Sequence, residues 1–308
     1  MLYQQIEQNK RNTWLVMGAF ALLMGVICFL LSYYLNLYLG LIFLAIAIIY
    51  LVYIYWYAVK HLMKVTHAVK VRREDAPELY EMVEEMAIAA GIPMPEVYIV
   101  PTPIPNAFAT GRDPEHASLA VTTGLLKIMD KKELLGVIGH EMSHIRNYDI
   151  RVTMIASALS RFIYLAAVIL SVTGWEMFNV KSDSMLVKGI GWLLGAACLM
   201  VGVPLFLFAL PIAKLLSLAM SRQREYLADI GSVDLTRDPT CITSSLKKLQ
   251  SYEAIMSNAQ REEAGKQEGE VSAMAFNTYA VKHWWTNLIS DHPTLDKRIE
   301  RLSHTADV

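Results

Sequence analysis

The sequence contains only three cysteines in 308 residues, and they are scattered. Cys28 and Cys198 lie in apolar runs and Cys241 lies in a polar segment, so the spacing indicates neither a disulfide framework nor a zinc ribbon. The formal net charge is only −1, whereas a general nucleic-acid binder carries a basic excess. We therefore expect no nucleic-acid partner.

Charged residues are also scarce, at 19% of the chain, whereas hydrophobic residues make up 54%. With a mean hydropathy of +0.33, the chain is too apolar for an ordinary soluble domain of this length. The sequence has no internal repeat, no glycine-rich phosphate loop and no nucleophile elbow. The composition therefore indicates a membrane protein. The missing motifs argue against nucleotide-binding and serine-hydrolase sites.

Two long apolar runs, 14–35 and 37–59, stand near the start of the sequence, and each is long enough to cross a bilayer. The tip between them, around Asn36, carries no charge, whereas both feet are basic. The basic residues of the feet are Lys10, Arg11, Lys60, Lys64, Lys70, Arg72 and Arg73. The positive-inside rule places both feet of this predicted transmembrane hairpin in the cytoplasm.

A second pair of apolar runs, 152–175 and 189–221, is separated by a short polar loop. Arg161 in the first run is costly in lipid, so we expect it near the cytoplasmic end or facing other helices. The second run is longer than a span requires, and Pro204 and Pro211 are expected to kink it. We expect this pair to span the membrane; partial packing against a soluble domain is the alternative.

The sequence His140-Glu141-Met142-Ser143-His144, between the two apolar pairs, has the HExxH pattern. Asp130 followed by Glu133 predicts a helix N-cap with a capping box, so the motif is expected inside a helix. Residues four apart share a helix face, so both imidazoles can bind one metal ion while Glu141 flanks it. The alternative is an exposed helix face that carries these residues by chance.

Zinc is the expected metal, because it accepts neutral imidazole nitrogens and keeps an open position for water in catalytic sites. It lowers the pKa of that water to about 7. Glu141 would then take the proton as the water attacks a peptide carbonyl.

The run 221–229, which follows the second apolar pair, offers a third ligand. A hairpin returns to the side it left, so Glu225 is expected near His144 as a zinc ligand. Asp229 lies four residues later, on the same helix face, and is expected to orient one histidine. Asp149, five residues after His144, is a second candidate for such a supporting role.

The same run also contains Arg222 and Arg224, which we interpret as anchors that reach toward the membrane surface rather than as site residues. The alternative for the whole run is a solvated, charged helix that continues from the membrane.

The segment before the HExxH motif predicts a helix from Pro77 to just before Gly91, and then strands at 96–100, 107–110 and 118–122. An extended substrate can add to an open strand edge through backbone hydrogen bonds. Asn106 and Ala107, at the start of one strand, are therefore candidate substrate-binding residues; an ordinary hairpin in the core is the alternative.

Taken together, these residues resemble the HtpX family of heat-shock-associated bacterial membrane metalloproteases, which is related to the CAAX prenyl proteases. The resemblance covers nearly the whole chain. It is carried by the N-terminal hairpin, the stretches 106–111, 140–144 and 221–229, and His292-Pro293. The chain departs from the family pattern at Gly139, where alanine is common, at Tyr148, where glycine is common, and at Thr294, where a second proline is usual.

The resemblance implies that His140, His144 and Glu225 bind zinc and that Glu141 is the catalytic base. It also implies that His292 stabilises the transition state and that Asn106 and Ala107 bind the substrate backbone. Its further implication is quality control of misfolded membrane proteins in the bacterial inner membrane, overlapping in function with the protease FtsH.

We therefore expect a mainly α-helical membrane protein with about four transmembrane helices and a small α+β, zincin-like metalloprotease domain on the cytoplasmic side. The expected divisions are a first hairpin at 1–65, a soluble part at 66–151, a second hairpin at 152–221 and a second soluble part at 222–308. The expected function is zinc endopeptidase acting on protein substrates at the lipid bilayer.

Two other classes of function stay open at this point. A zinc-binding scaffold or chaperone-like module would keep the fold without cutting, although Glu141 beside three ligands argues against it. A transporter or channel is disfavoured because the apolar runs lack paired ionisable residues at mid-membrane, Arg161 standing alone.

Overall fold

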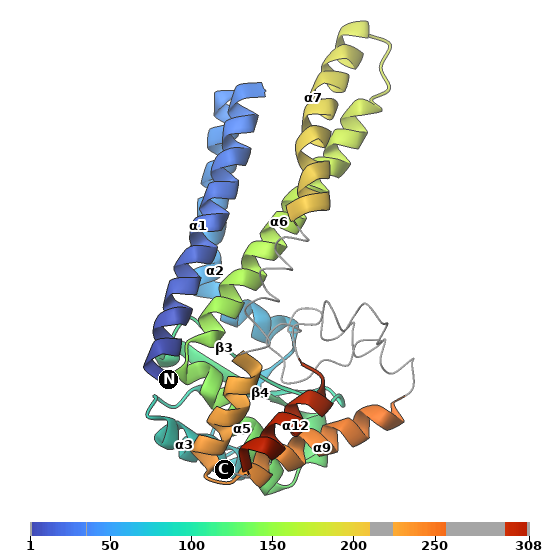
Figure 1. Cartoon of the computed structure of the whole chain (residues 1–308). Coiled ribbons are helices and arrows are strands. Elements are labelled where there is room, and N and C mark those ends of the chain that lie inside the picture. The colour runs from blue at the N-terminus through green and yellow to red at the C-terminus, as the bar shows by residue number, and fades with distance from the viewer. Residues whose placement is uncertain (1, 35, 210–223, 257–292, 307–308) are drawn as a thin grey trace. The chain divides into compact units, whose positions relative to one another are not determined.

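The computed structural model describes residues 2–34, 36–209, 224–256 and 293–306 (Figure 1). The chain divides into two compact units. The mixed unit comprises 1–10, 57–154 and 217–308, and it holds the sheet. The apolar unit comprises 11–56 and 155–216 and is built from helices. The four-part division expected from the sequence stays a prediction.

The apolar unit is made from parts of four long helices. These are α1 (Leu2–Tyr34), α2 (Leu37–Val65), α6 (Asp149–Phe178) and α7 (Met185–Pro204). By length and composition, three stretches of the described chain could cross a membrane, namely Gly40–Val65, Asp149–Phe178 and Met185–Leu207. The fourth expected span falls on α1, whose described apolar stretch, Thr13–Phe29, is shorter. Three candidate spans are therefore shown where four were expected.

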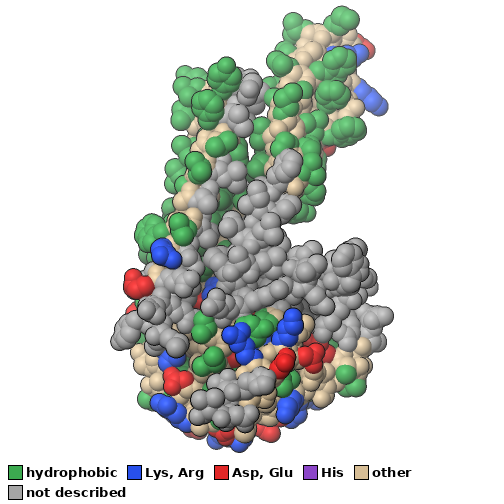
Figure 2. All heavy atoms as spheres, viewed as in Figure 1, with side chains coloured by type: hydrophobic (Ala, Val, Ile, Leu, Met, Phe, Trp, Pro, Cys, Tyr) green, Lys and Arg blue, Asp and Glu red, His purple; other side chains and the backbone are tan. Residues whose placement is uncertain are grey.

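Hydrophobic side chains predominate among the described side chains of the apolar unit in Figure 2, as expected for helices whose natural surroundings are lipid. Within this unit the ring of Phe162 contacts the rings of Phe20, Phe43 and Tyr50, with centroids 5.8, 6.2 and 4.8 Å away. The Tyr50 hydroxyl donates a hydrogen bond to the backbone oxygen of Ala158 at 3.0 Å. Aromatic packing from α6 thus joins the two hairpins.

The winding of the second hairpin changes at Pro204, where a kink was expected. Helix α7 ends there, and a π-helical turn, η2 (Leu205–Ala209), follows without a break in helical backbone. Proline lacks the N–H that would continue the α-helical hydrogen-bond ladder, which accounts for the change at this residue. Pro211 lies outside the described residues.

The sheet of the mixed unit has four strands in the order β1-β2-β4-β3. They are β1 (Val69–Lys70), β2 (Glu96–Val100), β3 (Ala107–Gly111) and β4 (Ala117–Thr122). β2 and β4 are parallel, and the outer pairs, β1 with β2 and β3 with β4, are antiparallel. β3 is therefore an edge strand, in agreement with the expectation from the sequence.

Helices cover the sheet because each presents one apolar face to it. α3 (Pro77–Ala90) buries Leu79, Met82 and Val83 and ends at Gly91, whose φ of 67° lies in the left-handed region that suits glycine. α5 (Lys131–Arg146) begins at the predicted Asp130–Glu133 capping box. Both helices share one core with β3 and β4, while Leu62 and Met63 of α2 cover the opposite face of the sheet.

Two further helices, residues 224–236 and α9 (Pro239–Ile255), are held closely against α5. Ser232 Oγ donates to the backbone oxygen of Gly136 at 2.6 Å, and Ser245 Oγ donates to the backbone oxygen of Glu133 at 2.6 Å. A Cβ on Gly231 would lie only 2.1 Å from Ser143 Oγ, so the glycine permits this approach. The helix that carries Glu225 is thereby fixed beside the HExxH helix.

Candidate metal centre

Three potential ligand atoms converge where α5 meets the helix of residues 224–236. His140 Nε2 and His144 Nε2 are 3.1 Å apart. Glu225 Oε2 lies 3.7 Å from His140 Nε2, and Glu225 Oε1 lies 3.5 Å from His144 Nε2. All three side chains offer one ligand atom within 4.8 Å of the others. The structure thus brings together the three residues that the sequence predicted as ligands.

These separations fit a zinc ion. Zinc binds imidazole nitrogen and carboxylate oxygen at about 2.0–2.2 Å, so two ligand atoms of a tetrahedral site lie roughly 3.3–3.5 Å apart. The two Nε2 atoms are 3.1 Å apart, close to that spacing, and each lies within 3.7 Å of one of the two Glu225 oxygens, so the carboxylate can supply an oxygen to the same ion. Two imidazoles with one carboxylate are a donor set that catalytic zinc uses.

The charge of the surrounding groups also suits a divalent cation. Four carboxylates face two guanidinium groups here, which leaves an excess of two negative charges when all are ionised. The carboxylates belong to Glu141, Asp149, Glu225 and Asp229, and the guanidinium groups to Arg224 and Arg298.

A carboxylate faces the remote ring nitrogen of each histidine. His140 Nδ1 lies 3.0 Å from Asp229 Oδ1, and His144 Nδ1 lies 3.0 Å from Asp149 Oδ2. An Nδ1–H donated to a carboxylate leaves the Nε2 lone pair for a metal. Asp229 and Asp149 therefore lie where the sequence predicted supporting residues.

The two histidines differ in basicity. Burial dominates at His140 and lowers its pKa to about 4, despite the opposing hydrogen bond to Asp229. Burial also lowers the pKa of His144, but the hydrogen bond to Asp149 and the nearby charge of Glu225 outweigh it and raise the value to about 9. The two imidazoles therefore differ in basicity although each faces a carboxylate.

Glu141 stands next to the ligands with only 1% of its surface exposed. Burial raises the pKa of its carboxyl to about 7, with a further upward contribution from Glu225. The charge of His144 and the backbone N–H of Ala109 lower this pKa, but by less than burial raises it. A carboxyl with a pKa near neutrality is well suited to accept and return a proton.

The open edge of β3 lies beside this carboxyl. Thr122 N donates to Asn106 O at 2.9 Å, so Asn106 pairs with β4 by hydrogen bonds. In an antiparallel pair, residues that bond to the partner strand alternate with residues whose backbone groups point away from it. The backbone groups of Ala107 and Ala109 therefore point away from β4. Asn106 Oδ1 accepts the N–H of Ala107 at 2.9 Å. Asn106 and Ala107 therefore stand at the outer edge of the sheet, where Asn106 bonds to β4 and its Oδ1 occupies the N–H of Ala107.

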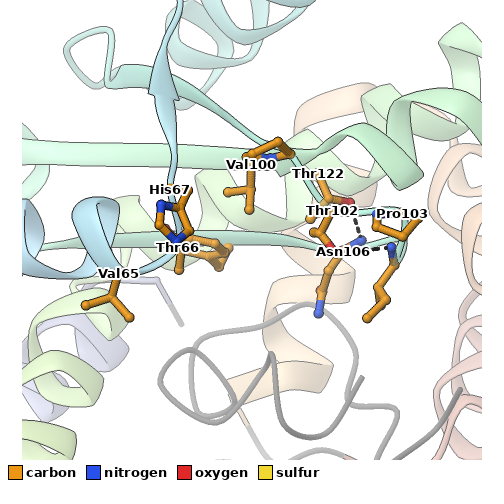
Figure 3. A pocket seen from close by; sticks show the side chains of 11 residues that line it. Val65, Thr66, His67, Val100, Thr102, Pro103, Asn106 and Thr122 are labelled. Atoms are coloured by element: carbon orange, nitrogen blue, oxygen red, sulfur yellow. Dashed lines mark hydrogen bonds between the residues drawn. The ribbon is translucent and has the colours of Figure 1, made fainter. Parts of the chain in front are cut away.

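A mostly apolar cavity of about 320 Å³ lies beside the first residues of β3. Figure 3 shows Asn106 and Thr122 on one side of it and the end of α2, with Val65, Thr66 and His67, on the other. The side chain of Phe108 also lines it, on the sheet face opposite α5. The cavity therefore adjoins the strand edge but lies on the sheet face away from the ligands.

Two arginines that were not predicted from the sequence as site residues belong to this site. Arg298 of α12 (Leu295–Ala306) donates to Asp229 through Nε and NH2, at 2.9 and 2.6 Å. Arg224, interpreted as a membrane-surface anchor, instead has NH1 3.6 Å from Asp149 Oδ1. An available signal was electrostatic: buried aspartates that support histidines require cationic partners. His292 lies outside the described residues.

The model of peptidase family M48 matches residues 73–306. A protein described as a protease HtpX homolog from Limosilactobacillus reuteri is 41% identical over 98% of this chain and 99% of its own. One from Streptococcus pyogenes is 39% identical over 99% of this chain and all of its own.

The chain belongs to peptidase family M48. It is accordingly a metalloprotease, and the resemblance seen in the sequence is confirmed. The chain also resembles S. mikatae Ste24p, with a TM-score of 0.49 and 17% identity over 98% of this chain and 66% of that longer one. M48 membership implies a metal, and the cluster of His140, His144 and Glu225 is consistent with one.

Proposed function

We propose that this M48 protein is a zinc endopeptidase in which His140, His144 and Glu225 bind the metal and Glu141 is the general base. The observation that carries the proposal is the convergence of three ligand atoms within 4.8 Å, next to a buried carboxyl. Zinc bound there would polarise a peptide carbonyl and lower the pKa of the attacking water.

The protein's own groups perform the remaining steps of the proposed reaction. The substrate pairs with the open edge of β3, where Ala107 and Ala109 present backbone groups. The Glu141 carboxylate takes the proton of the attacking water and returns it to the leaving amide nitrogen. Asp229 and Asp149 hold the two imidazoles by their Nδ1 atoms throughout.

Metal removal and return, compared with Glu141→Gln, tests this function. The full-length protein in detergent is stripped with a chelator and assayed on a loosely folded protein before and after zinc is restored. We expect activity to vanish and return in the wild type. Glu141→Gln should bind zinc at the wild-type ratio and lose activity by a factor of about 10²–10⁴, which is the usual contribution of a general base.

Glu225→Ala should fail to retain zinc, whereas Glu85→Gln, which changes an exposed glutamate of α3, should alter neither zinc content nor activity. If folded wild-type protein holds one zinc per chain but cuts none of a varied set of substrates, the proposal is wrong. The zinc-binding scaffold would then be the better description.

We further propose that the site faces the cytoplasm of a bacterial cell from the inner membrane and that its substrates are misfolded membrane proteins. The basic residues that flank the first hairpin support the orientation. The candidate spans and the protease relatives support a membrane-bound enzyme that acts on proteins. Overlap with FtsH follows from that substrate class and belongs to the same proposal.

A further inference from the structure

Arg298 is a fully buried charged side chain of the site that is neither a proposed ligand nor the proposed base. Its exposed fraction is 1%. The guanidinium donates two hydrogen bonds to Asp229, Nε to Oδ2 at 2.9 Å and NH2 to Oδ1 at 2.6 Å. NH1 also lies 3.8 Å from Glu225 Oε2. One arginine of α12 therefore contacts a supporting carboxylate and a proposed ligand.

The pairing compensates for the burial of both charges. A buried guanidinium or carboxylate is costly alone, and a two-point hydrogen-bonded pair offsets much of that cost. The two donors of Arg298 also fix the orientation of the Asp229 carboxylate, with Oδ1 3.0 Å from His140 Nδ1. Asp229 consequently stays an acceptor for the Nδ1–H of His140.

A second contact shows why Asp229 must lie between Arg298 and His140. Arg298 NH2 lies 3.4 Å from His140 Nδ1, close enough to donate to it. If it did so, the ring proton would have to reside on Nε2, the atom that faces the other ligands, and zinc could not bind there. Asp229 Oδ1 lies within hydrogen-bond distance of both groups, at 2.6 and 3.0 Å, and so separates the two donors.

We propose that Arg298 is a positioning residue for the metal centre: through Asp229 it fixes His140 in the tautomer that binds zinc. The inference rests on the proposed function, because it takes His140 as a ligand. It assigns to α12 a part in metal retention, although no residue of that helix is a proposed ligand.

The neighbouring residue provides a matched control. Lys297 is also a long basic side chain on α12, but it is exposed. Lys297→Met removes a charge from the same helix without touching the site. Arg298→Lys keeps the charge but loses the planar fork that reaches both oxygens of Asp229.

The test measures the rate at which zinc passes from the full-length, zinc-loaded protein in detergent to a chromogenic chelator. Loss of an outer partner of a metal ligand typically costs 10- to 100-fold in metal affinity. We expect Arg298→Met to release zinc about 10- to 100-fold faster, Arg298→Lys to fall between, and Lys297→Met to match the wild type. Substitution with Co²⁺ should give an altered visible spectrum in Arg298→Met, because the ligand geometry changes.

A double variant separates positioning from folding. Asp229→Ala leaves Arg298 free to donate to His140, so Asp229→Ala with Arg298→Met should retain zinc better than Asp229→Ala alone. A purely structural arginine would instead make the double variant worse than either single one, and would lower the thermal unfolding midpoint of the metal-free protein without changing the zinc release rate of folded molecules. That pattern would overturn the proposal.

The failure of this inference is distinguishable from failure of the proposed function. If the wild type binds no zinc, the metal centre itself is wrong. If the wild type holds one zinc and Arg298→Met releases it at the wild-type rate, only the role of Arg298 is wrong.

Discussion

Tyr148 stands between a proposed ligand, His144, and its supporting residue, Asp149, in a backbone conformation that suits glycine. Its φ is 62°, in the left-handed region, where a side chain costs roughly 1–2 kcal/mol. Arg151 lies over the tyrosine ring, 4.8 Å from its centroid, and donates to the backbone oxygen of Arg112. The positive φ explains why glycine would suit this position, where this chain carries a tyrosine.

Comparison of Tyr148→Gly with Tyr148→Ala tests that strain. Both variants lose the ring contact with Arg151, but only glycine relieves the positive φ. We expect the glycine variant to exceed the alanine variant in free energy of unfolding by about 1 kcal/mol, the reverse of their order in a helix interior. Thermal unfolding of the zinc-loaded proteins in detergent measures the difference. An alanine variant of equal or greater stability would show that the strain is not present in solution.

Gly136 and Gly139 of α5 form a second informative pair. A Cβ on Gly136 would lie 2.5 Å from the backbone carbon of Cys241, whereas a Cβ on Gly139 would meet Ser232 Oγ at 3.1 Å. We expect Gly136→Ala to destabilise the protein by about 1–3 kcal/mol through overpacking. Gly139→Ala should stay within about 1 kcal/mol of wild type, because the gain in helix propensity offsets the tighter contact. Equal unfolding midpoints for the two variants would contradict this.

At the scale of elements, β3 is the edge strand on which the proposed substrate pairing depends. It is held firmly on one side by β4, and the backbone groups of Ala107 and Ala109 on its other side point away from the sheet. An extended peptide added there would present alternate residues to β3 and the residues between them to the opposite side.

Peptide substrates with single N-methyl groups test this pairing. Methylation removes one backbone donor, and each lost hydrogen bond is worth about 0.5–1.5 kcal/mol, or roughly 2- to 10-fold in kcat/KM. We expect cleavage to slow at every second position near the scissile bond and to change little at the positions between. A loss that declines smoothly with distance, without a period of two, would exclude strand addition to β3.

Sequence patterns predicted those elements whose cause is local. The Asp130–Glu133 box predicted the start of α5, and the four-residue spacing of His140 and His144 placed both on one face. Glu225 was placed beside them only because a hairpin returns to its origin. Arg298 was missed because its partner, Asp229, is 69 positions away, and no local pattern marks a contact between distant helices.

At the scale of the whole molecule, the arrangement relative to a membrane carries a prediction. Asp183, between α6 and α7, and Glu74, in the mixed unit, are both exposed. If both hairpins cross the membrane, cysteines at these two positions react from opposite sides.

In a cysteine-free background, Asp183→Cys in spheroplasts should react with an impermeant maleimide, whereas Glu74→Cys should react only after the membrane is opened. Loss of reaction after pretreatment with the same reagent provides the control. The reverse pattern would place the protease outside the cell, and reaction of both from one side would mean that the second hairpin does not span.

The site is formed by residues of α5, of the helix 224–236 and of α12. In the sequence, the candidate spans of α6 and α7 come between α5 and residues 224–236. His140 and Arg298 are 158 positions apart. A ribosome adds residues in chain order, so α5 is made well before Glu225 and Arg298 exist. The metal centre can therefore form only after the candidate spans of α6 and α7 have been synthesised, so a partly made chain carries no complete protease site.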